Sequence, residues 1–144
     1  MRRADLKKRR YGRIGRYEYP PPKKTVIELP IILHIKQVYK LLYQIGTKLP
    51  KHDKLGLHHE LEILTVEILE IGLEAVLRPR SEKHAVLYSL RRKIEALKHL
   101  VRIEQELSIL SEKQYLALAS LLTDISMMAT GWQKSLTQNP PTKA

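Results

Sequence analysis

Apolar residues recur at alternating intervals of four and three positions through most of the chain. Because an α-helix turns once in about 3.6 residues, this spacing places the apolar side chains along one helix face. The pattern predicts four amphipathic helices, whose apolar members are Ile31, Ile35, Val38, Leu42, Ile45 and Leu49; Leu57, Leu61, Leu64, Ile68, Ile71 and Ala75; Leu87, Leu90, Ile94, Leu97 and Val101, drifting to Ile103, Leu107 and Leu110; and Tyr115, Leu118, Leu122, Ile125, Ala129, Trp132 and Leu136.

Residues typical of helix starts and ends separate the four series. Proline suits a first helical turn, a Ser or Asp side chain can cap an N-terminus, and Gly or a later Pro ends a helix. The predicted starts are marked by Pro30, Asp53, Ser81 and a capping box of Ser111 and Gln114, and the predicted ends by Gly46 with Pro50 and by Pro79. The turns are short, so consecutive helices should run antiparallel. We therefore predict an all-α fold, an up-down-up-down four-helix bundle.

The apolar surface is wider than one bundle core needs. A further apolar edge on the second helix and extra positions on the fourth are formed by Val66, Leu69, Leu73 and Val76, and by Leu116, Leu121 and Met128. Large unpartnered apolar faces commonly mark interfaces between subunits. We expect a homo-oligomer; the alternative is an imperfectly amphipathic monomer.

Positive charge is concentrated at the N-terminus. The chain of 144 residues has a net charge of +11, and residues 1–24 hold ten basic and two acidic side chains, a net +8. Gly12, Gly15 and the prolines from Pro20 to Pro22 disfavour a stable helix there. The chain is therefore expected to divide into a flexible, disordered basic arm at 1–27, a bundle at 28–137 and a polar tail at 138–144.

The arm combines tyrosines with arginines, which can stack on bases and neutralise phosphates. Its candidate nucleic-acid contacts are Arg9, Arg10, Arg13, Arg16, Lys23 and Lys24. Such contacts supply affinity without base readout, and binding should weaken with salt. An anionic membrane surface is a weaker alternative, because the arm lacks the apolar face that inserts into lipid. We expect a nucleic-acid partner and no membrane.

A second basic cluster lies in the third predicted helix. Its candidate nucleic-acid contacts are Arg91, Arg92, Lys98 and Arg102, and spacings of seven and four place three of them near one face. The first helix adds Lys36 and Lys40, so the first and third helices are expected to build one basic surface, while the second helix is acidic. The alternative interpretation is that these cations keep the bundle soluble and pair with acidic neighbours.

No residue pattern indicates catalysis or a cofactor site. The chain has no Cys, which excludes disulfides, thiolate zinc sites and cysteine nucleophiles. His52, His58 and His59 lack the spacing of a metal site and are interpreted as surface histidines. Glutamates recur every seven positions in the second helix, at Glu60, Glu67 and Glu74, as on a solvated face or beside basic neighbours. We expect a non-enzymatic protein without metal or cofactor, and a cytoplasmic location, since neither a membrane span nor a secretory signal is found.

Three stretches carry a resemblance to a known family. They are Pro30-Ile31-Ile32 at the start of the first helix, the turn from Leu49 to Leu57, and the Gly131-Trp132-Gln133-Lys134-Ser135-Leu136 stretch near the end of the fourth. Together they resemble the accessory variability determinant (Avd) family of diversity-generating retroelements over residues 28–137. The related proteins encoded in ribosomal-RNA intervening sequences usually carry a Ser-Ile-Pro-Ser-Asn-Ile-Ala-Glu-Gly-like stretch in the second helix. Residues 65–72 depart from it, which favours the Avd side.

The resemblance implies a basic homopentamer that associates with the element's reverse transcriptase and with nucleic acid. Such a protein supports template-RNA-primed, adenine-mutagenic cDNA synthesis, while the reverse transcriptase performs the chemistry. The long basic arm is not demanded by the family pattern. Two alternatives stay open, a protein of the ribosomal-RNA intervening-sequence type and an oligomeric protein scaffold without a nucleic-acid function.

Overall fold

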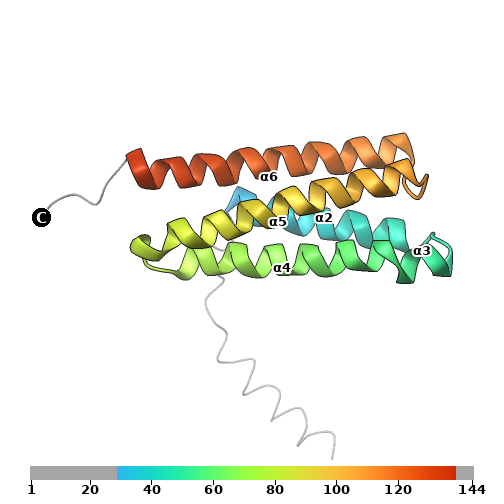
Figure 1. Ribbon diagram of the computed structural model, residues 1–144, viewed down its shortest axis with the longest axis horizontal. Coiled ribbons are helices and arrows are strands. Elements are labelled where there is room, and N and C mark those ends of the chain that lie inside the picture. Colours follow the sequence, from blue (N-terminus) through green and yellow to red (C-terminus); the bar gives the residue numbers. More distant parts are fainter. Residues whose placement is uncertain (1–28, 139–144) are drawn as a thin grey trace, which may run out of the picture.

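The computed structural model describes residues 29–138, which form helices joined by short turns (Figure 1). The helices are α2 (Pro30–Gly46), α3 (Lys51–Leu55), α4 (Leu57–Leu77), α5 (Arg80–Glu106) and α6 (Glu112–Gln138). These residues contain no strand. The predicted all-α fold class with four long helices is confirmed, and the breaks predicted at Pro50 and Pro79 fall between helices.

The four long helices pack around one shared core. α2 contacts α4 and α6, and α5 contacts the same two helices, so α2 and α5 lie diagonally across the bundle. The expectation that the first and third helices build one basic surface is therefore wrong. Either α4 or α6 separates the cations of α2 from those of α5.

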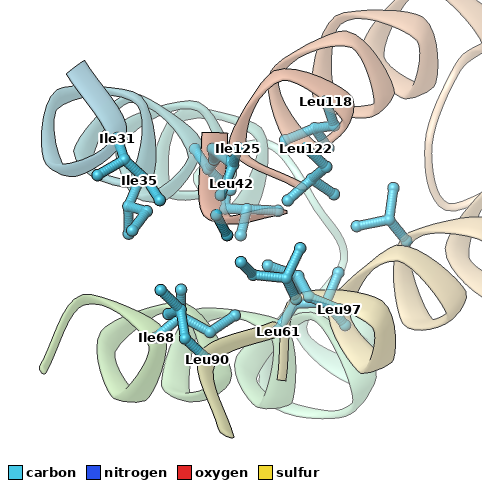
Figure 2. Close-up of a cluster of buried hydrophobic side chains, with 14 of the residues drawn as sticks. Ile31, Ile35, Leu42, Leu61, Ile68, Leu90, Leu97, Leu118, Leu122 and Ile125 are labelled. Carbon is cyan, nitrogen blue, oxygen red and sulfur yellow. The ribbon is translucent and has the colours of Figure 1, made fainter. Parts of the chain in front are cut away.

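Aliphatic side chains from all four long helices fill this core (Figure 2). The predicted series from Leu87 to Val101 is confirmed, because each of its members is at most 1% exposed. The inner faces of α2 and α6 are also largely as predicted, with Ile31, Ile35, Val38, Leu42 and Ile45 and with Leu118, Leu122, Ile125 and Ala129 buried. Full burial of one such aliphatic side chain other than alanine contributes about 1.5–3 kcal/mol.

Helix α4 buries Leu61, Ile68 and Ala75 of its predicted series but not the other three members. Its buried positions are His58, Leu61, Thr65, Ile68, Gly72 and Ala75, whereas Leu57, Leu64 and Ile71 are half-buried at the flanks. A Cβ on Gly72 would lie 3.1 Å from Cδ1 of Ile32, so α2 and α4 approach each other closely. Small side chains therefore take inner positions that hydrophobicity alone assigns to larger neighbours.

The predicted caps are confirmed at one helix and wrong at two. At the start of α6, the Ser111 N–H donates to Oε1 of Gln114 at 2.9 Å, and the Gln114 N–H donates to Oγ of Ser111 at 3.1 Å. Asp53 instead lies inside the short helix α3, and Ser81 lies inside α5, which begins after Pro79. The tight turns at Gly56 and Pro79 start α4 and α5 without a side-chain cap.

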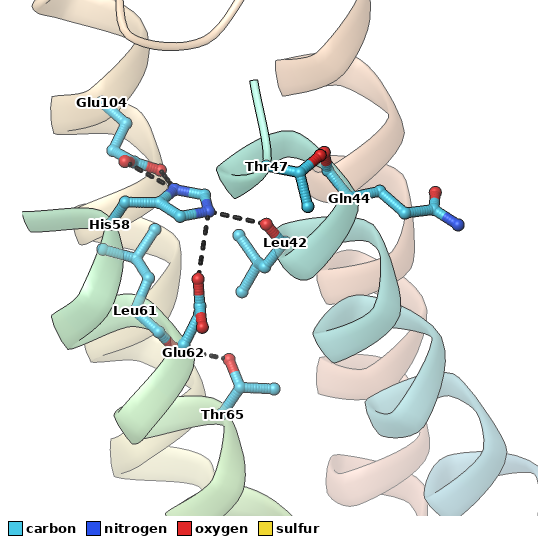
Figure 3. A network of polar contacts seen from close by, with 8 residues as sticks. All are labelled: Leu42, Gln44, Thr47, His58, Leu61, Glu62, Thr65 and Glu104. Atoms are coloured by element: carbon cyan, nitrogen blue, oxygen red, sulfur yellow. Dashed lines mark hydrogen bonds and ion pairs between the residues drawn. The ribbon is translucent and has the colours of Figure 1, made fainter. Parts of the chain in front are cut away.

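A buried polar cluster joins α2, α4 and α5 (Figure 3). Nδ1 of His58 lies 3.0 Å from Oε2 of Glu104, and both side chains have no exposed surface. Nε2 of His58 lies 2.6 Å from the Leu42 carbonyl oxygen and 3.6 Å from Oε1 of Glu62. A Cβ on Gly46 would lie 3.1 Å from Nε2 of His58, so the last residue of α2 must be small to admit the ring. The interpretation of His58 as a surface histidine is wrong.

The surroundings of His58 favour its charged form. Both ring nitrogens face acceptors, which favours an imidazolium that donates to Glu104 and to the Leu42 carbonyl. Burial is the largest influence on the pKa of His58 and lowers it. The hydrogen bonds to Glu104 and Leu42 and the charges of Glu104 and Glu62 together outweigh burial, so this pKa lies above the ordinary 6.5.

Glu104 also corrects the predicted course of the α5 apolar face. Of the predicted drift to Ile103, Leu107 and Leu110, only Leu110 is buried. Ile103 and Leu107 are exposed, and Glu104 is buried instead. Glu104 continues the spacing of the buried residues Leu97 and Val101. The buried face of α5 therefore continues without a change of direction as far as Glu104, whose carboxylate is neutralised by His58.

Of the extra predicted surfaces, Val66 and Leu116 remain exposed in the single chain, whereas Leu69 and Val76 are half-buried. Val66, Leu73 and Leu77 recur at spacings of seven and four on α4, a set termed the α4 apolar face. Val66 is 41% and Leu77 81% exposed, whereas Leu73 is half-buried. Leu116 of α6 is exposed as well, and Leu121 and Met128 are half-buried. The chain's own core thus covers this surface only in part.

Candidate nucleic-acid interface

The predicted contacts in the bundle all lie on α5. They are Arg91, Arg92, Lys98 and Arg102, and Lys98 is half-buried while the three arginines are exposed. The predicted arm contacts Arg9, Arg10, Arg13, Arg16, Lys23 and Lys24 lie outside the described residues. The bundle contacts differ from one another in how far neighbouring carboxylates neutralise them.

Arg91 is held by a neutral partner on α6. Its NH1 group donates to Oε1 of Gln133 at 2.6 Å, and Gln133 is only 7% exposed. The Gln133 amide in turn donates to the His84 carbonyl oxygen at 3.4 Å, a long bond. Because no carboxylate contacts Arg91 within residues 29–138, the amide orients the guanidinium and leaves its charge unneutralised.

Arg92 lies above an aromatic ring of its own helix. Its guanidinium carbon is 5.9 Å from the centroid of the Tyr88 ring. Tyr88 itself is 58% exposed. Arg92 likewise makes no ion pair in the described part of the chain. A tyrosine ring beside an unneutralised arginine offers both a stacking surface and a phosphate contact.

Lys98 and Arg102 are paired along α5. Nζ of Lys98 lies 3.0 Å from Oε1 of Glu95, and Nε of Arg102 lies 3.2 Å from Oε1 of Glu106. Arg102 also lies over the Tyr115 ring at 5.4 Å, and Tyr115, more than Glu106, raises the pKa of Arg102. These carboxylates interrupt the predicted basic face, because a phosphate must compete with them for the cations.

Two further cations gather where α5 begins, and they were not among the predicted contacts. Nζ of Lys83 donates to the carbonyl oxygens of Ala75 at 2.7 Å and Val76 at 2.9 Å, at the C-terminal end of α4. Arg80 donates to the carbonyl oxygens of Ser135 at 3.4 Å and Leu136 at 3.3 Å, near the end of α6. Cations at helix C-termini stabilise the helix dipole and the last carbonyls. Only the packing of the three helices brings these groups together.

The neighbouring Arg78 is neutralised by contrast. It forms ion pairs with Glu74 at 2.9 Å and with Glu82 at 3.2 Å, across the turn between α4 and α5. Glu74 first, and then Glu82, raises the pKa of Arg78. Two turns earlier on the same face of α4, Glu67 pairs with Lys93 of α5 at 3.2 Å. The alternative that acidic residues of α4 serve as partners for basic neighbours therefore holds for Glu67 and Glu74.

The arm joins the bundle at the same end as Arg80 and Lys83. Leu29, the first described residue, lines a pocket together with Trp132 of α6, and Nζ of Lys83 lies 5.9 Å from the Trp132 ring centroid. We call Arg80, Lys83, Arg91 and Arg92 the α5 basic cluster. Leu29, the residue to which the predicted arm connects, thus lies close to the Lys83 end of that cluster.

Comparisons with protein-family models, with curated proteins and with solved structures find no match to this chain. The resemblance to the Avd family therefore stays a prediction. Within residues 29–138, no group of three or more His, Cys, Asp or Glu side chains could hold a metal ion. None of the described helices combines the length and apolar character that a membrane span requires.

Proposed function

We propose that this protein is a non-enzymatic, nucleic-acid-binding accessory protein that associates with the reverse transcriptase of a diversity-generating retroelement. In this role it supports template-RNA-dependent, mutagenic cDNA synthesis. The proposed assembly is a homo-oligomer, a pentamer by family resemblance, of up-down-up-down bundles. The observation that carries the proposal is the α5 basic cluster beside the point where the +8 arm joins the bundle.

The unneutralised charges on α5 support a phosphate ligand. Arg91 and Arg92 have no carboxylate partner among the described residues, and their side chains are held by Gln133 and Tyr88. Lysines and arginines that neutralise phosphates release condensed counterions, so affinity depends steeply on salt. We therefore assign the main bundle contacts to Arg91 and Arg92, and weaker ones to Lys98 and Arg102.

A gel-shift titration with a structured RNA across a salt series tests this assignment. Replacing Arg91 and Arg92 with alanine should lower the magnitude of the log–log salt slope by about 2, because each phosphate contact contributes about 1. Replacing Lys98 and Arg102 should lower it by less, since ion pairs already engage them.

Lys36→Ala/Lys40→Ala is the matched control, because it removes the same charge from α2, across the bundle from α5. This variant should keep the wild-type slope. If Lys36→Ala/Lys40→Ala lowered the salt slope as much as the replacement of Arg91 and Arg92, this would contradict the location of the interface. Wild-type protein that binds no RNA even at low salt would contradict the function itself.

A specific observation also favours the alternative, an oligomeric protein scaffold. The α4 apolar face is exposed in the single chain and suits a protein partner. Deleting residues 1–24 and reversing Arg91, Arg92, Lys98 and Arg102 to Glu separates the two functions. A scaffold keeps its protein partner and loses nothing, whereas the proposed accessory protein loses RNA binding. Copurification of a reverse transcriptase encoded beside this chain tests the partnership directly.

A further inference from the structure

An open apolar pocket lies where α2 begins and α6 approaches its end. Its volume is about 360 Å³, and its lining consists of Leu29, Pro30, Ile31, Met128, Gly131 and Trp132. A dry cavity of about 150 Å³ already admits a molecule the size of benzene. We call this site the Trp132 pocket. It has room for aliphatic side chains, and its lining supplies no charged group.

Gly131 leaves one side of the pocket bare. This glycine lies in the interior of α6 and does not have a positive φ angle. A Cβ built on it would meet no atom of the described chain within 4 Å. Glycine inside a helix costs stability relative to alanine, and here no contact within the bundle calls for it. The bare backbone is therefore open to an occupant from outside residues 29–138.

The nearest apolar segment of the same chain is Val26-Ile27. These residues precede Leu29, which itself lines the pocket, and they are the only aliphatic pair between Gly15 and Glu28. An extended chain spans at most about 3.6 Å per residue, so Ile27 lies within about 7 Å of Leu29. We propose that Val26 and Ile27 occupy the Trp132 pocket and anchor the basic arm to α6.

This anchor has a consequence that rests on the proposed function. Lys23 and Lys24 directly precede the anchored segment, and Lys83 lies over the Trp132 ring at 5.9 Å. Anchoring would hold the base of the arm next to the Lys83 end of the α5 basic cluster. One nucleic acid molecule could then contact the arm and the α5 basic cluster together, without the entropic cost of ordering a free arm.

The experiment uses the full chain without nucleic acid and reads the fluorescence of Trp132, the only tryptophan. The variant Val26→Ser/Ile27→Ser should shift the emission to longer wavelength and increase quenching by acrylamide. Trypsin should cleave it after Lys24 about tenfold faster than wild type, which corresponds to about 1.4 kcal/mol. Val26→Leu/Ile27→Leu should restore the wild-type behaviour, because any fitting aliphatic pair fills the pocket.

Ile14→Ser is the matched control, since it removes an apolar side chain from the same arm at a position far before Leu29 in the sequence. It should leave both readouts unchanged, and equal helical circular dichroism in all variants shows that the bundle is folded. Unchanged emission and cleavage in the Val26→Ser/Ile27→Ser variant would overturn the proposal. Wild-type emission that depends on protein concentration would assign the pocket to a second copy, and emission that changes only on adding RNA would assign it to a base. Because docking is measured without RNA, its failure is distinguishable from a failure of the proposed function.

Discussion

Residue by residue, His58 and Glu104 are the most unusual groups in the bundle. Each is 0% exposed, and their ion pair connects α4 to α5 while the second imidazole nitrogen bonds the end of α2. Removing one partner of a buried pair leaves an uncompensated charge and costs about 3–5 kcal/mol. His58 thus links three helices through one side chain.

The stability of the bundle should therefore decrease as the pH rises above neutrality. The folded-state pKa of His58 is raised above its ordinary value of 6.5. The stabilisation by the bound proton is therefore complete below pH 6.5 and is lost as the pH rises through the folded-state pKa. Urea unfolding between pH 6 and pH 9 measures this as a falling free energy of unfolding. An NMR titration of the His58 ring should give a midpoint above 6.5.

The control for this prediction is Glu104→Gln, which removes the charge and keeps the size of the side chain. It should be less stable at pH 6, and its free energy of unfolding should vary less over the same interval. A His58 midpoint at or below 6.5 in the wild-type chain would contradict the imidazolium assignment.

At the scale of the element, the turn after α5 contains the only non-glycine residue of the described chain with a positive φ. Ser108 has φ of 59°, and its N–H bonds the Gln105 carbonyl at 3.0 Å while the Ile109 N–H bonds the Glu104 carbonyl at 2.9 Å. This is a Schellman motif, in which glycine usually occupies the position of Ser108. The turn also fixes the backbone that carries Glu104.

Ser108→Gly should stabilise the protein by about 0.5–1 kcal/mol, because glycine adopts the left-handed conformation without Cβ strain. Chemical denaturation should show a higher midpoint with an unchanged slope. Ser108→Ala is the comparison variant and should gain nothing, since it keeps the Cβ. A loss of stability in the glycine variant would show that Ser108 contributes an interaction that outweighs the strain.

Helix by helix, the spacing of apolar residues predicted α5 and α6 well and α4 poorly. The buried residues of α5 from Leu87 to Val101 are aliphatic, so periodicity and hydrophobicity agree there. In α4, the buried positions include His58, Thr65 and Gly72. Their burial depends on how closely α2 approaches and on a carboxylate contributed by α5. Neither can be read from α4 alone.

At the scale of the whole molecule, the α4 apolar face is the part that a single chain leaves unsatisfied. Light scattering of the full chain should give the mass of an oligomer, several times the 16.8 kDa of one chain. Val66→Glu/Leu77→Glu should lower that mass toward the monomer, because burying the introduced charges in an interface is costly.

Leu107→Glu is the matched control for this prediction. Leu107 is 62% exposed at the turn after α5, away from the α4 apolar face. Its replacement should leave the mass unchanged. A wild-type mass of 16.8 kDa at all concentrations would contradict self-association.

The candidate interface could be predicted only in part. Charge counting identified Arg91 and Arg92, but it did not distinguish them from Lys98 and Arg102, whose carboxylate partners lie on the same helix at i−3 and i+4. Such pairs are visible in the spacing, although side-chain geometry determines whether they form. Arg80 and Lys83 depend on which helix ends meet, which no local pattern contains.

The amino-acid sequence by itself determined the four helices, most of their buried faces, the capping box at Ser111 and the concentration of charge in the arm. These follow from local rules, since helix periodicity, turn residues and net charge need no knowledge of distant partners. Tertiary structure alone decided that His58 is buried against Glu104, that α2 and α5 lie diagonally opposite, and that Leu29 lies near Trp132 and Lys83. Each of these depends on a contact between residues far apart in the chain, and the energy of such a contact exists only once the helices have packed.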